Sequence, residues 1–326
     1  MGARRVVKAA CTSLFALVAG AGSAFGGLAA PSLAAPSQNG PRIVDKEQVA
    51  DNWWKITVYS PSMDKEIVND VLRAPAKSAP TFYLLQGAEG GQGGRSWFDL
   101  TNAPDFFKGK RVNVIAPIGD PGSMYTDWDQ DDPVLGRVKW QTYLTKELPA
   151  ALGKELGMNG KTAVGGVSIS AGPAIDLMVQ DPKFFSAAAA YSGCPITSGA
   201  RQWQTGSLVR YTGGGDAANM WSGDEWAAHD PSQNLAKLKG KPLYLAASTG
   251  APGEVDQLSS DGEGLGGSFI ESMSQQCTDE FVQDARDAGL SLTYDRREEG
   301  GHDWGLFGSE MEASWGQVIA PALGTK

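Results

Sequence analysis

Short apolar runs recur along the chain after about residue 50, and polar or glycine-rich segments separate them. The predicted strands are 54–59, 81–85, 112–117, 162–167, 187–191, 242–247 and 291–296, and the predicted helices are 140–156, 171–180 and 271–288. This alternation of compact apolar strands with helical patterns predicts an α/β fold, in which helices cover both faces of a mostly parallel central sheet.

One stretch, 197–230, interrupts the alternation. It contains three consecutive glycines and the tryptophans Trp203, Trp221 and Trp226, which indicates an inserted loop or cap region. No internal repeat and no linker-like change of composition divides the rest of the sequence. Residues 53–326 are therefore predicted to form a single domain.

The first 34 residues have the pattern of an export signal. Three basic residues precede an apolar stretch at 9–24, and Ser32-Leu33-Ala34 fits the small-x-small rule for cleavage. A membrane anchor is the alternative, but the apolar stretch is short and rich in Gly and Ala in its second half. Residues 35–52 are polar and contain Pro, Asn and Gly, so they are predicted to form a flexible lead into the domain.

Charge and composition narrow the classes of partner. The chain of 326 residues has 28 Lys and Arg against 37 Asp and Glu, a net charge of -9. Nucleic-acid binding is not expected, because it requires a basic surface. The mature chain is expected to be secreted and soluble. In an oxidising compartment Cys194 and Cys277, the cysteines that remain after cleavage, can pair, and two buried free thiols are the alternative.

The strongest chemical signal is Gly165-Gly166-Val167-Ser168-Ile169-Ser170-Ala171-Gly172, between a predicted strand and a predicted helix. This order is typical of a nucleophile elbow, whose sharp turn needs small residues two positions before and after the nucleophile. Gly166 and Ser170 meet that need around Ser168, and the amide of Ile169 would point at an oxyanion. Ser170, flanked by Ser168 and Gly172, is an alternative nucleophile, and a plain glycine-rich turn is the alternative without chemistry.

An elbow serine needs a histidine as its general base, and the chain has only His229 and His302. His302 follows the last predicted strand in a glycine-containing loop, where α/β-hydrolases carry this residue, so it is the predicted base. His229 is expected to lie on the surface. Position alone leaves the acid of the triad open among five carboxylates: Glu254, Asp256, Asp261, Glu263 and Glu271. Of these, position favours Glu254 and Asp256.

Six segments, together with the elbow and His302-Asp303-Trp304, resemble the secreted mycolyltransferases of mycolic-acid bacteria, the antigen 85 group. They occur in the family's order, and the resemblance spans about residues 55–320. The segments are Ser60-Pro61-Ser62-Met63, Tyr83-Leu84-Leu85-Gln86-Gly87, Tyr125-Thr126-Asp127-Trp128, Lys139-Trp140-Gln141-Thr142-Tyr143-Leu144-Thr145-Lys146-Glu147-Leu148-Pro149, Asn219-Met220-Trp221 with Asp230-Pro231, and Phe269-Ile270-Glu271. The resemblance implies an α/β-hydrolase fold.

The resemblance also assigns the acid and the oxyanion hole. In the family the acid lies in a Phe-Leu-Glu-like segment that opens a helix, which implies Glu271 here. The oxyanion hole would combine the backbone N–H groups of Ile169 and Ala88. A bridge between Cys194 and Cys277 would hold the helix of this acid to the sheet.

The residues expected to bind the substrate depart from the family pattern. Relatives that bind trehalose carry Asp where this chain has Gln86, and Arg where it has Glu89 and Gly90. Arg95 can substitute if the glycine-rich loop before it folds back, and Trp304 is a further candidate contact. The sequence therefore does not decide which molecule accepts the acyl group: trehalose, arabinan, glycerol, or a Ser or Thr side chain of an exported protein.

The implied reaction is a two-step acyl transfer at the cell envelope. Ser168 would take a mycolyl group from a glycolipid donor of the trehalose monomycolate type and pass it to a hydroxyl acceptor. No metal or other cofactor is expected, and the inserted region at 197–230 is a candidate groove for the acyl chain. A lipid hydrolase or carboxylesterase with the same triad is the close alternative. A non-catalytic surface binding protein on this fold is a second alternative, which the complete set Ser168, Glu271 and His302 disfavours.

Overall fold

The computed structural model describes residues 39–256 and 264–325, so the predicted export signal lies outside the described residues. One nine-stranded sheet runs through the described part, in the order β1-β2-β3-β5-β4-β6-β7-β8-β9. The strands are β1 Arg42–Gln48, β2 Trp53–Ser60, β3 Lys65–Leu72, β4 Ala79–Leu85, β5 Asn113–Ile118, β6 Met158–Val167, β7 Phe185–Tyr191, β8 Leu243–Ser248 and β9 Thr293–Arg297.

The sheet has an antiparallel end and a parallel body. Strands β1, β2 and β3 pair antiparallel with one another, and β3 pairs antiparallel with β5. From β5 through β4, β6, β7 and β8 to β9 every pairing is parallel. All seven residues of β4 are buried, as expected of a central parallel strand covered on both faces. The predicted mostly parallel α/β sheet is confirmed.

Two strands of the antiparallel end were not predicted. Strand β1 lies inside the segment interpreted as a flexible lead, and its residues are almost all exposed and mostly charged or polar. It pairs with β2 as an edge strand, so its order comes from backbone hydrogen bonds rather than apolar burial. Strand β3 carries buried Asn69 and Asp70 in its centre, which interrupts the apolar pattern by which a strand is recognised.

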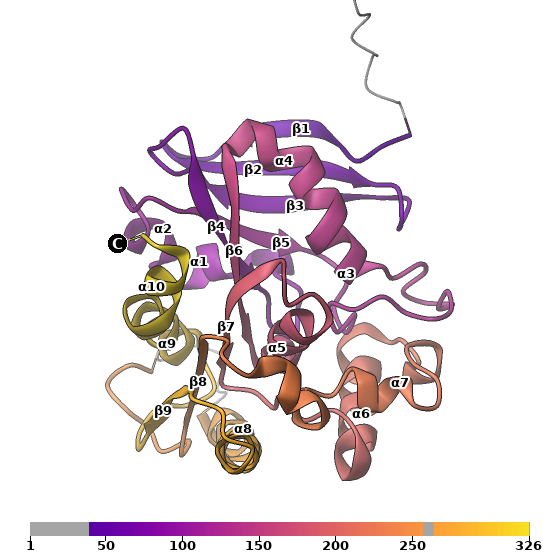
Figure 1. The fold of residues 1–326 in the computed structure, drawn as a ribbon, viewed down its shortest axis with the longest axis vertical. Helices are drawn as coiled ribbons and strands as arrows, with labels where there is room; N and C mark the ends of the chain where they lie inside the picture. The colour runs from indigo at the N-terminus through magenta and orange to yellow at the C-terminus, as the bar shows by residue number, and fades with distance from the viewer. Residues whose placement is uncertain (1–38, 257–263, 326) are drawn as a thin grey trace, which may run out of the picture. The chain divides into compact units, whose positions relative to one another are not determined.

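Helices cover both faces of the sheet, as Figure 1 shows. The helices are α1 Trp97–Leu100, α2 Ala103–Phe106, α3 Trp140–Thr142, α4 Leu148–Leu156, α5 Ala171–Gln180, α6 Gln202–Gly213, α7 Glu225–Ala228, α8 Gly264–Asp287, α9 Trp304–Ser314 and α10 Ala320–Leu323. The residues of β4 alternate between the two layers: Tyr83 and Leu85 pack with α4, α5 and α8 on one face, and Phe82 and Leu84 pack with α1, α9 and α10 on the other.

The parallel register brings several strand ends to one edge of the sheet. Leu85 of β4 pairs with Gly166 of β6, and Val167 pairs with Tyr191 at the end of β7. The segments that follow these strands therefore emerge side by side at the carboxyl edge, where open α/β sheets bind their ligands. Within the described ranges, no helix has the length and apolar character needed to cross a membrane.

Candidate active site

Ser168 lies at the turn between β6 and the helical segment that continues into α5. Its backbone φ is 55°, in the left-handed region that residues other than glycine rarely adopt. A nucleophile elbow requires this strained conformation. Small neighbours make this turn accessible: a Cβ at Gly166 would lie 2.1 Å from the carbonyl oxygen of Ser170, and a Cβ at Gly193 would lie 2.3 Å from that of Ser168. The predicted need for a glycine before the serine therefore has a direct steric cause.

Ser170, the alternative nucleophile, makes hydrogen bonds that hold the turn together. Its hydroxyl is fully buried and accepts a hydrogen bond of 2.8 Å from the N–H of Val167. The hydroxyl also lies 3.0 Å from the carbonyl oxygen of Val167 and 3.3 Å from that of Leu85. These contacts tie the turn to the ends of two strands and leave Ser168 as the serine that faces a histidine.

His302 connects Ser168 to a carboxylate. Its Nε2 lies 2.8 Å from Ser168 Oγ, and its Nδ1 lies 2.7 Å from Glu271 Oε2. Because an ionised carboxylate only accepts, Nδ1 carries the proton, and Nε2 is then free to accept from the serine hydroxyl. The ring therefore has the tautomer and orientation of a general base.

Glu271 is fully buried within α8, two turns after the helix begins. Besides His302, it accepts hydrogen bonds from the backbone N–H of Ser248, at 2.8 Å, and from the hydroxyl of Ser192, at 2.9 Å. These three donors fix the orientation of the carboxylate toward the ring. Ser192 was not among the predicted site residues, although its position directly after β7 at the carboxyl edge was a usable signal.

Of the other candidate acids, the two that the structure describes, Glu254 and Asp256, have no hydrogen bond to the histidine ring. Asp256 instead accepts hydrogen bonds from the N–H groups of Gly253 and Gly301, at 2.8 and 2.7 Å, and so anchors the loop that carries His302. Glu254 is exposed. Asp261 and Glu263 lie outside the described residues.

The two expected oxyanion donors lie in the segments that follow β6 and β4, two neighbouring parallel strands. Ile169 follows Ser168 in the elbow, and Ala88 lies in the loop after β4. Outside the helices and strands, no backbone hydrogen bond is described for the N–H of either residue. An oxyanion hole uses such N–H groups to stabilise the tetrahedral intermediate of acyl transfer.

The candidate substrate residues have different surroundings. Gln86 is fully buried, its Oε1 accepts from the N–H of Trp97 at 3.2 Å, and its Nε2 has no described partner. Arg95 folds back onto Glu89, with 2.9 Å between Nε and Oε1, so a carboxylate and a guanidinium lie together on this loop. Trp304 is only 8% exposed and packs edge to face against Trp97.

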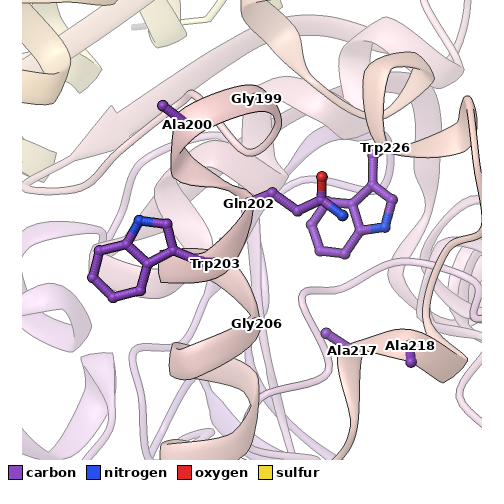
Figure 2. Close-up of a pocket in the computed structure, with 8 residues that line it drawn as sticks. All are labelled: Gly199, Ala200, Gln202, Trp203, Gly206, Ala217, Ala218 and Trp226. Atoms are coloured by element: carbon purple, nitrogen blue, oxygen red, sulfur yellow. The ribbon is translucent and has the colours of Figure 1, made fainter.

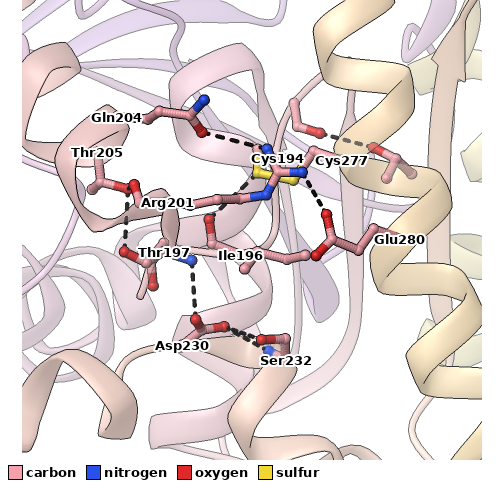
Figure 3. The surroundings of a disulfide bond; sticks show 12 residues. Cys194, Ile196, Thr197, Arg201, Gln204, Thr205, Asp230, Ser232, Cys277 and Glu280 are labelled. Carbon is pink, nitrogen blue, oxygen red and sulfur yellow. Dashed lines mark hydrogen bonds and ion pairs between the residues drawn. A yellow bond between two sulfur atoms is a disulfide. The ribbon is translucent and has the colours of Figure 1, made fainter. Parts of the chain in front are cut away.

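A disulfide joins Cys194 to Cys277 in α8 (Figure 3). Near it, Arg201 and Glu280 form an ion pair of 2.5 Å that also links the inserted region to α8. Glu271 lies six residues before Cys277 on the same helix. The disulfide therefore ties the helix of this carboxylate to the segment that follows β7.

The inserted region forms an open groove of about 530 Å³ beside α6 (Figure 2). Trp203 and Trp226 line it together with small residues of the same region. Trp203 is 68% exposed, whereas Trp226 and Trp221 are almost completely buried. Only the first of the three tryptophans is thus available to a ligand over most of its surface.

His229 is not the surface residue that the sequence suggested. Its Nδ1 lies 2.7 Å from Asp176 Oδ2, and its ring stacks on Trp221 with 4.5 Å between centroids. Burial raises the pKa of Asp176, and the contact with His229 lowers it. This pair lies apart from Ser168 in the hydrogen-bond network.

Within the described ranges, no group of three or more His, Cys, Asp or Glu side chains has the arrangement of a metal site.

Comparison with known proteins gives matches along most of the chain. A family model described as "Putative esterase" matches residues 60–317. The diacylglycerol acyltransferase/mycolyltransferase Ag85A of Mycobacterium tuberculosis (strain ATCC 25618 / H37Rv) is 30% identical over 273 residues, which cover 79% of this chain and 78% of the relative. The corresponding Ag85B of Mycobacterium avium is 30% identical over 250 residues, 72% of this chain and 73% of the relative.

Solved structures give the same picture of the fold. Mycobacterium tuberculosis MPT51 (FbpC1) superposes with a TM-score of 0.71 at 26% identity, over 84% of this chain and 100% of that chain. An S-formylglutathione hydrolase from Agrobacterium tumefaciens superposes with a TM-score of 0.57 at 14% identity, over 84% of this chain and 97% of that chain. At this low identity the second likeness concerns the fold alone.

Proposed function

The chain belongs to the "Putative esterase" family and, within it, to the antigen 85-like mycolyltransferases, and from this premise we propose that it transfers a mycolyl group through an acyl-enzyme on Ser168. The chain is an enzyme of the acyltransferase and esterase class. The observation that carries the proposal is the hydrogen-bonded line from Ser168 through His302 to buried Glu271, with distances of 2.8 and 2.7 Å.

In the first step, Ser168 Oγ attacks the ester carbonyl of a glycolipid donor. His302 Nε2 takes the serine proton as the new bond forms, and Glu271 stabilises the resulting imidazolium. The N–H groups of Ala88 and Ile169 would stabilise the oxyanion of the tetrahedral intermediate. When this intermediate collapses, His302 returns the proton to the departing sugar hydroxyl, and the acyl group remains on Ser168.

In the second step, His302 accepts the proton of an incoming hydroxyl, which attacks the acyl-enzyme. The product ester leaves with the acyl group, and the proton passes back to Ser168. Water in place of this hydroxyl would give hydrolysis by the same residues, so the two outcomes differ only in which nucleophile reaches the acyl-enzyme.

The loop after β4 bears on which acceptor is used. The ion pair of Glu89 and Arg95 offers charged donors and acceptors for sugar hydroxyls, while Gln86 is buried behind them. We include trehalose and arabinan among the acceptors on this basis. The predicted export signal supports action in the cell envelope, outside the cytoplasm. We assign the groove beside α6 to the acyl chain, because an alkyl chain needs an apolar surface.

Product analysis with trehalose monomycolate as donor tests this function. Purified protein is incubated with the donor and, in turn, with trehalose, an arabinan oligosaccharide and a serine-containing peptide. Mass spectrometry of an acylated acceptor supports the transferase. Free mycolic acid as the sole product, whichever acceptor is present, supports the hydrolase instead.

A further inference from the structure

A second buried glutamate lies behind the acid of the triad. Glu310, in α9, is fully buried, and both of its carboxyl oxygens lie close to Ser192 Oγ, at 3.2 and 3.1 Å. The same hydroxyl lies 2.9 Å from Glu271 Oε1. Ser192 is held in place by its own backbone, which has a φ of 47° and donates a hydrogen bond to Ala246. One hydroxyl therefore stands between two buried carboxyl groups.

The number of protons decides how these three groups can bond. The hydroxyl of Ser192 has one proton and can donate it to only one carboxylate. If Glu271 and Glu310 were both ionised, one of them would face the lone pairs of the serine oxygen without a donor. Glu271 has His302 and Ser248 as further donors, whereas Ser192 is the partner found for Glu310. Glu310 is thus the carboxyl group that holds the extra proton.

The surroundings of Glu310 agree with this assignment. Burial raises the pKa of Glu310 well above its ordinary value, and the negative charge of Glu271 raises it further. Arg297 opposes the shift, but its guanidinium is already paired with Asp295 at 2.7 Å. The titratable groups around Glu310, from the helix and three strands packed against it, are Glu271, Tyr191, Tyr244, Asp295 and Arg297.

We propose that Glu310 is a positioning residue of the active site: its neutral carboxylic acid donates to Ser192 Oγ, and Ser192 in turn donates to Glu271 Oε1. The proton of Ser192 is then directed only at the triad acid. Glu271 is held with its other oxygen toward His302, and a single negative charge lies behind the imidazolium. This inference rests on the proposed function, because it describes how the triad of that function is oriented.

Two substitutions separate this role from simple packing. Glu310→Leu keeps much of the volume but removes the donor, and we expect kcat for p-nitrophenyl butyrate to fall about tenfold with KM little changed. Glu310→Gln keeps a neutral donor in the same place, and we expect it to recover most of the lost rate. The acidic limb of its pH-rate profile should lie at the same pH as in the wild type, because one neutral group replaces another. If Glu310 were charged, its loss would move this limb to lower pH.

Ser192 provides a second test of the same chain of bonds. Ser192→Ala should lower kcat about as much as Glu310→Leu, and the double variant should be no slower than Ser192→Ala alone, since the two act through one contact. Glu312→Gln, on the same helix but only half-buried, is the matched control and should leave kcat unchanged. If Glu310→Leu does not fold, Glu310→Gln and Ser192→Ala still carry the test.

The inference is overturned if Glu310→Leu turns over at the wild-type rate, or if Glu310→Gln is as slow as Glu310→Leu. An NMR measurement separates it from the proposed function. The downfield proton on His302 Nδ1 reports its bond to Glu271 without turnover, and with only two histidines its assignment is simple. Its resonance should move in Glu310→Leu and stay in Glu310→Gln. Wild-type protein without turnover on any ester would instead contradict the proposed function.

Discussion

His302 Nε2 lies 2.8 Å from Ser168 Oγ, although 134 residues separate them along the chain. The contact exists because both follow strands of the parallel part of the sheet, whose carboxyl ends meet at one edge. Ser168 follows β6 directly, and His302 follows β9. The loop of His302 is fixed by Asp256, which accepts the N–H of Gly301. Fold and loop together thus bring the serine hydroxyl within hydrogen-bond distance of the imidazole ring.

Substitutions in the triad should lower turnover in a graded order. Ser168→Ala removes the nucleophile and should lower kcat for p-nitrophenyl butyrate by about 10⁴-fold or more. Glu271→Gln should cost less, because the base stays in place without its charge. His229→Ala is the control: its ring bonds to Asp176 rather than to the site, so most turnover should remain. A loss in His229→Ala equal to that in Ser168→Ala would contradict these roles.

The disulfide between Cys194 and Cys277 should contribute strongly to stability. It closes a loop with a sequence separation of 83, for which the chain-entropy model gives about 4 kcal/mol. The double variant Cys194→Ala/Cys277→Ala should have a free energy of unfolding in urea that is lower by roughly this amount. The wild type with its disulfide reduced should have the same lowered free energy of unfolding. Turnover should also fall, because α8 carries Glu271. Equal unfolding curves for the oxidised wild type and the double variant would contradict the prediction.

Asp70 should make stability depend on pH between about 4 and 6. Burial raises the pKa of Asp70 to about 6, although the hydrogen bond that Trp53 Nε1 donates to it acts to lower this pKa. The folded state therefore binds more protons than the unfolded state in this range, and stability falls as pH rises through it. The loss is on the order of 2–3 kcal/mol. Asp70→Asn, which stays neutral, should raise Tm at pH 8 and change it little at pH 4. A lower Tm at pH 8 would contradict this assignment.

The groove beside α6 should matter for long acyl chains only. Trp203 offers a large exposed apolar surface there, so Trp203→Ala should raise KM for a palmitoyl ester several-fold and leave KM for a butyryl ester unchanged. Tyr211→Ala is the matched control, since Tyr211 lies on the same helix, is 91% exposed and does not line the groove. Equal effects of both variants, or an equal effect on both esters, would contradict a role in chain binding.

The sequence was sufficient for the parts of the site that depend on local pattern. The elbow around Ser168 was recognisable because its small residues are a steric requirement of one turn, and His302 because it follows the last strand. The inner parallel strands β4, β7 and β8 were recognisable because they are covered on both faces and are therefore largely apolar. Strand β3 was not, because Asn69 and Asp70 occupy buried positions in it.

What the sequence could not provide depends on contacts between distant segments. Glu310 stands between Ser309 and Met311, and this local pattern does not distinguish a buried from an exposed helix position. Its burial results from packing of α9 against the end of β7, where it meets Ser192 from another part of the chain. Glu271 could be selected only through the family resemblance, because several carboxylates lie between β8 and His302. Which of them faces the ring depends on how α8 packs.

Detection of the acyl-enzyme tests most directly whether Ser168 is the nucleophile. The mature protein is mixed with trehalose monomycolate, quenched in acid within seconds and digested, and the peptide that contains Ser168 is analysed by mass spectrometry. We expect a mycolyl adduct on Ser168 that is lost when an acceptor is added, and no adduct in Ser168→Ala. Correctly folded protein with intact donor that forms no adduct, or an adduct on Ser170 instead, would contradict it.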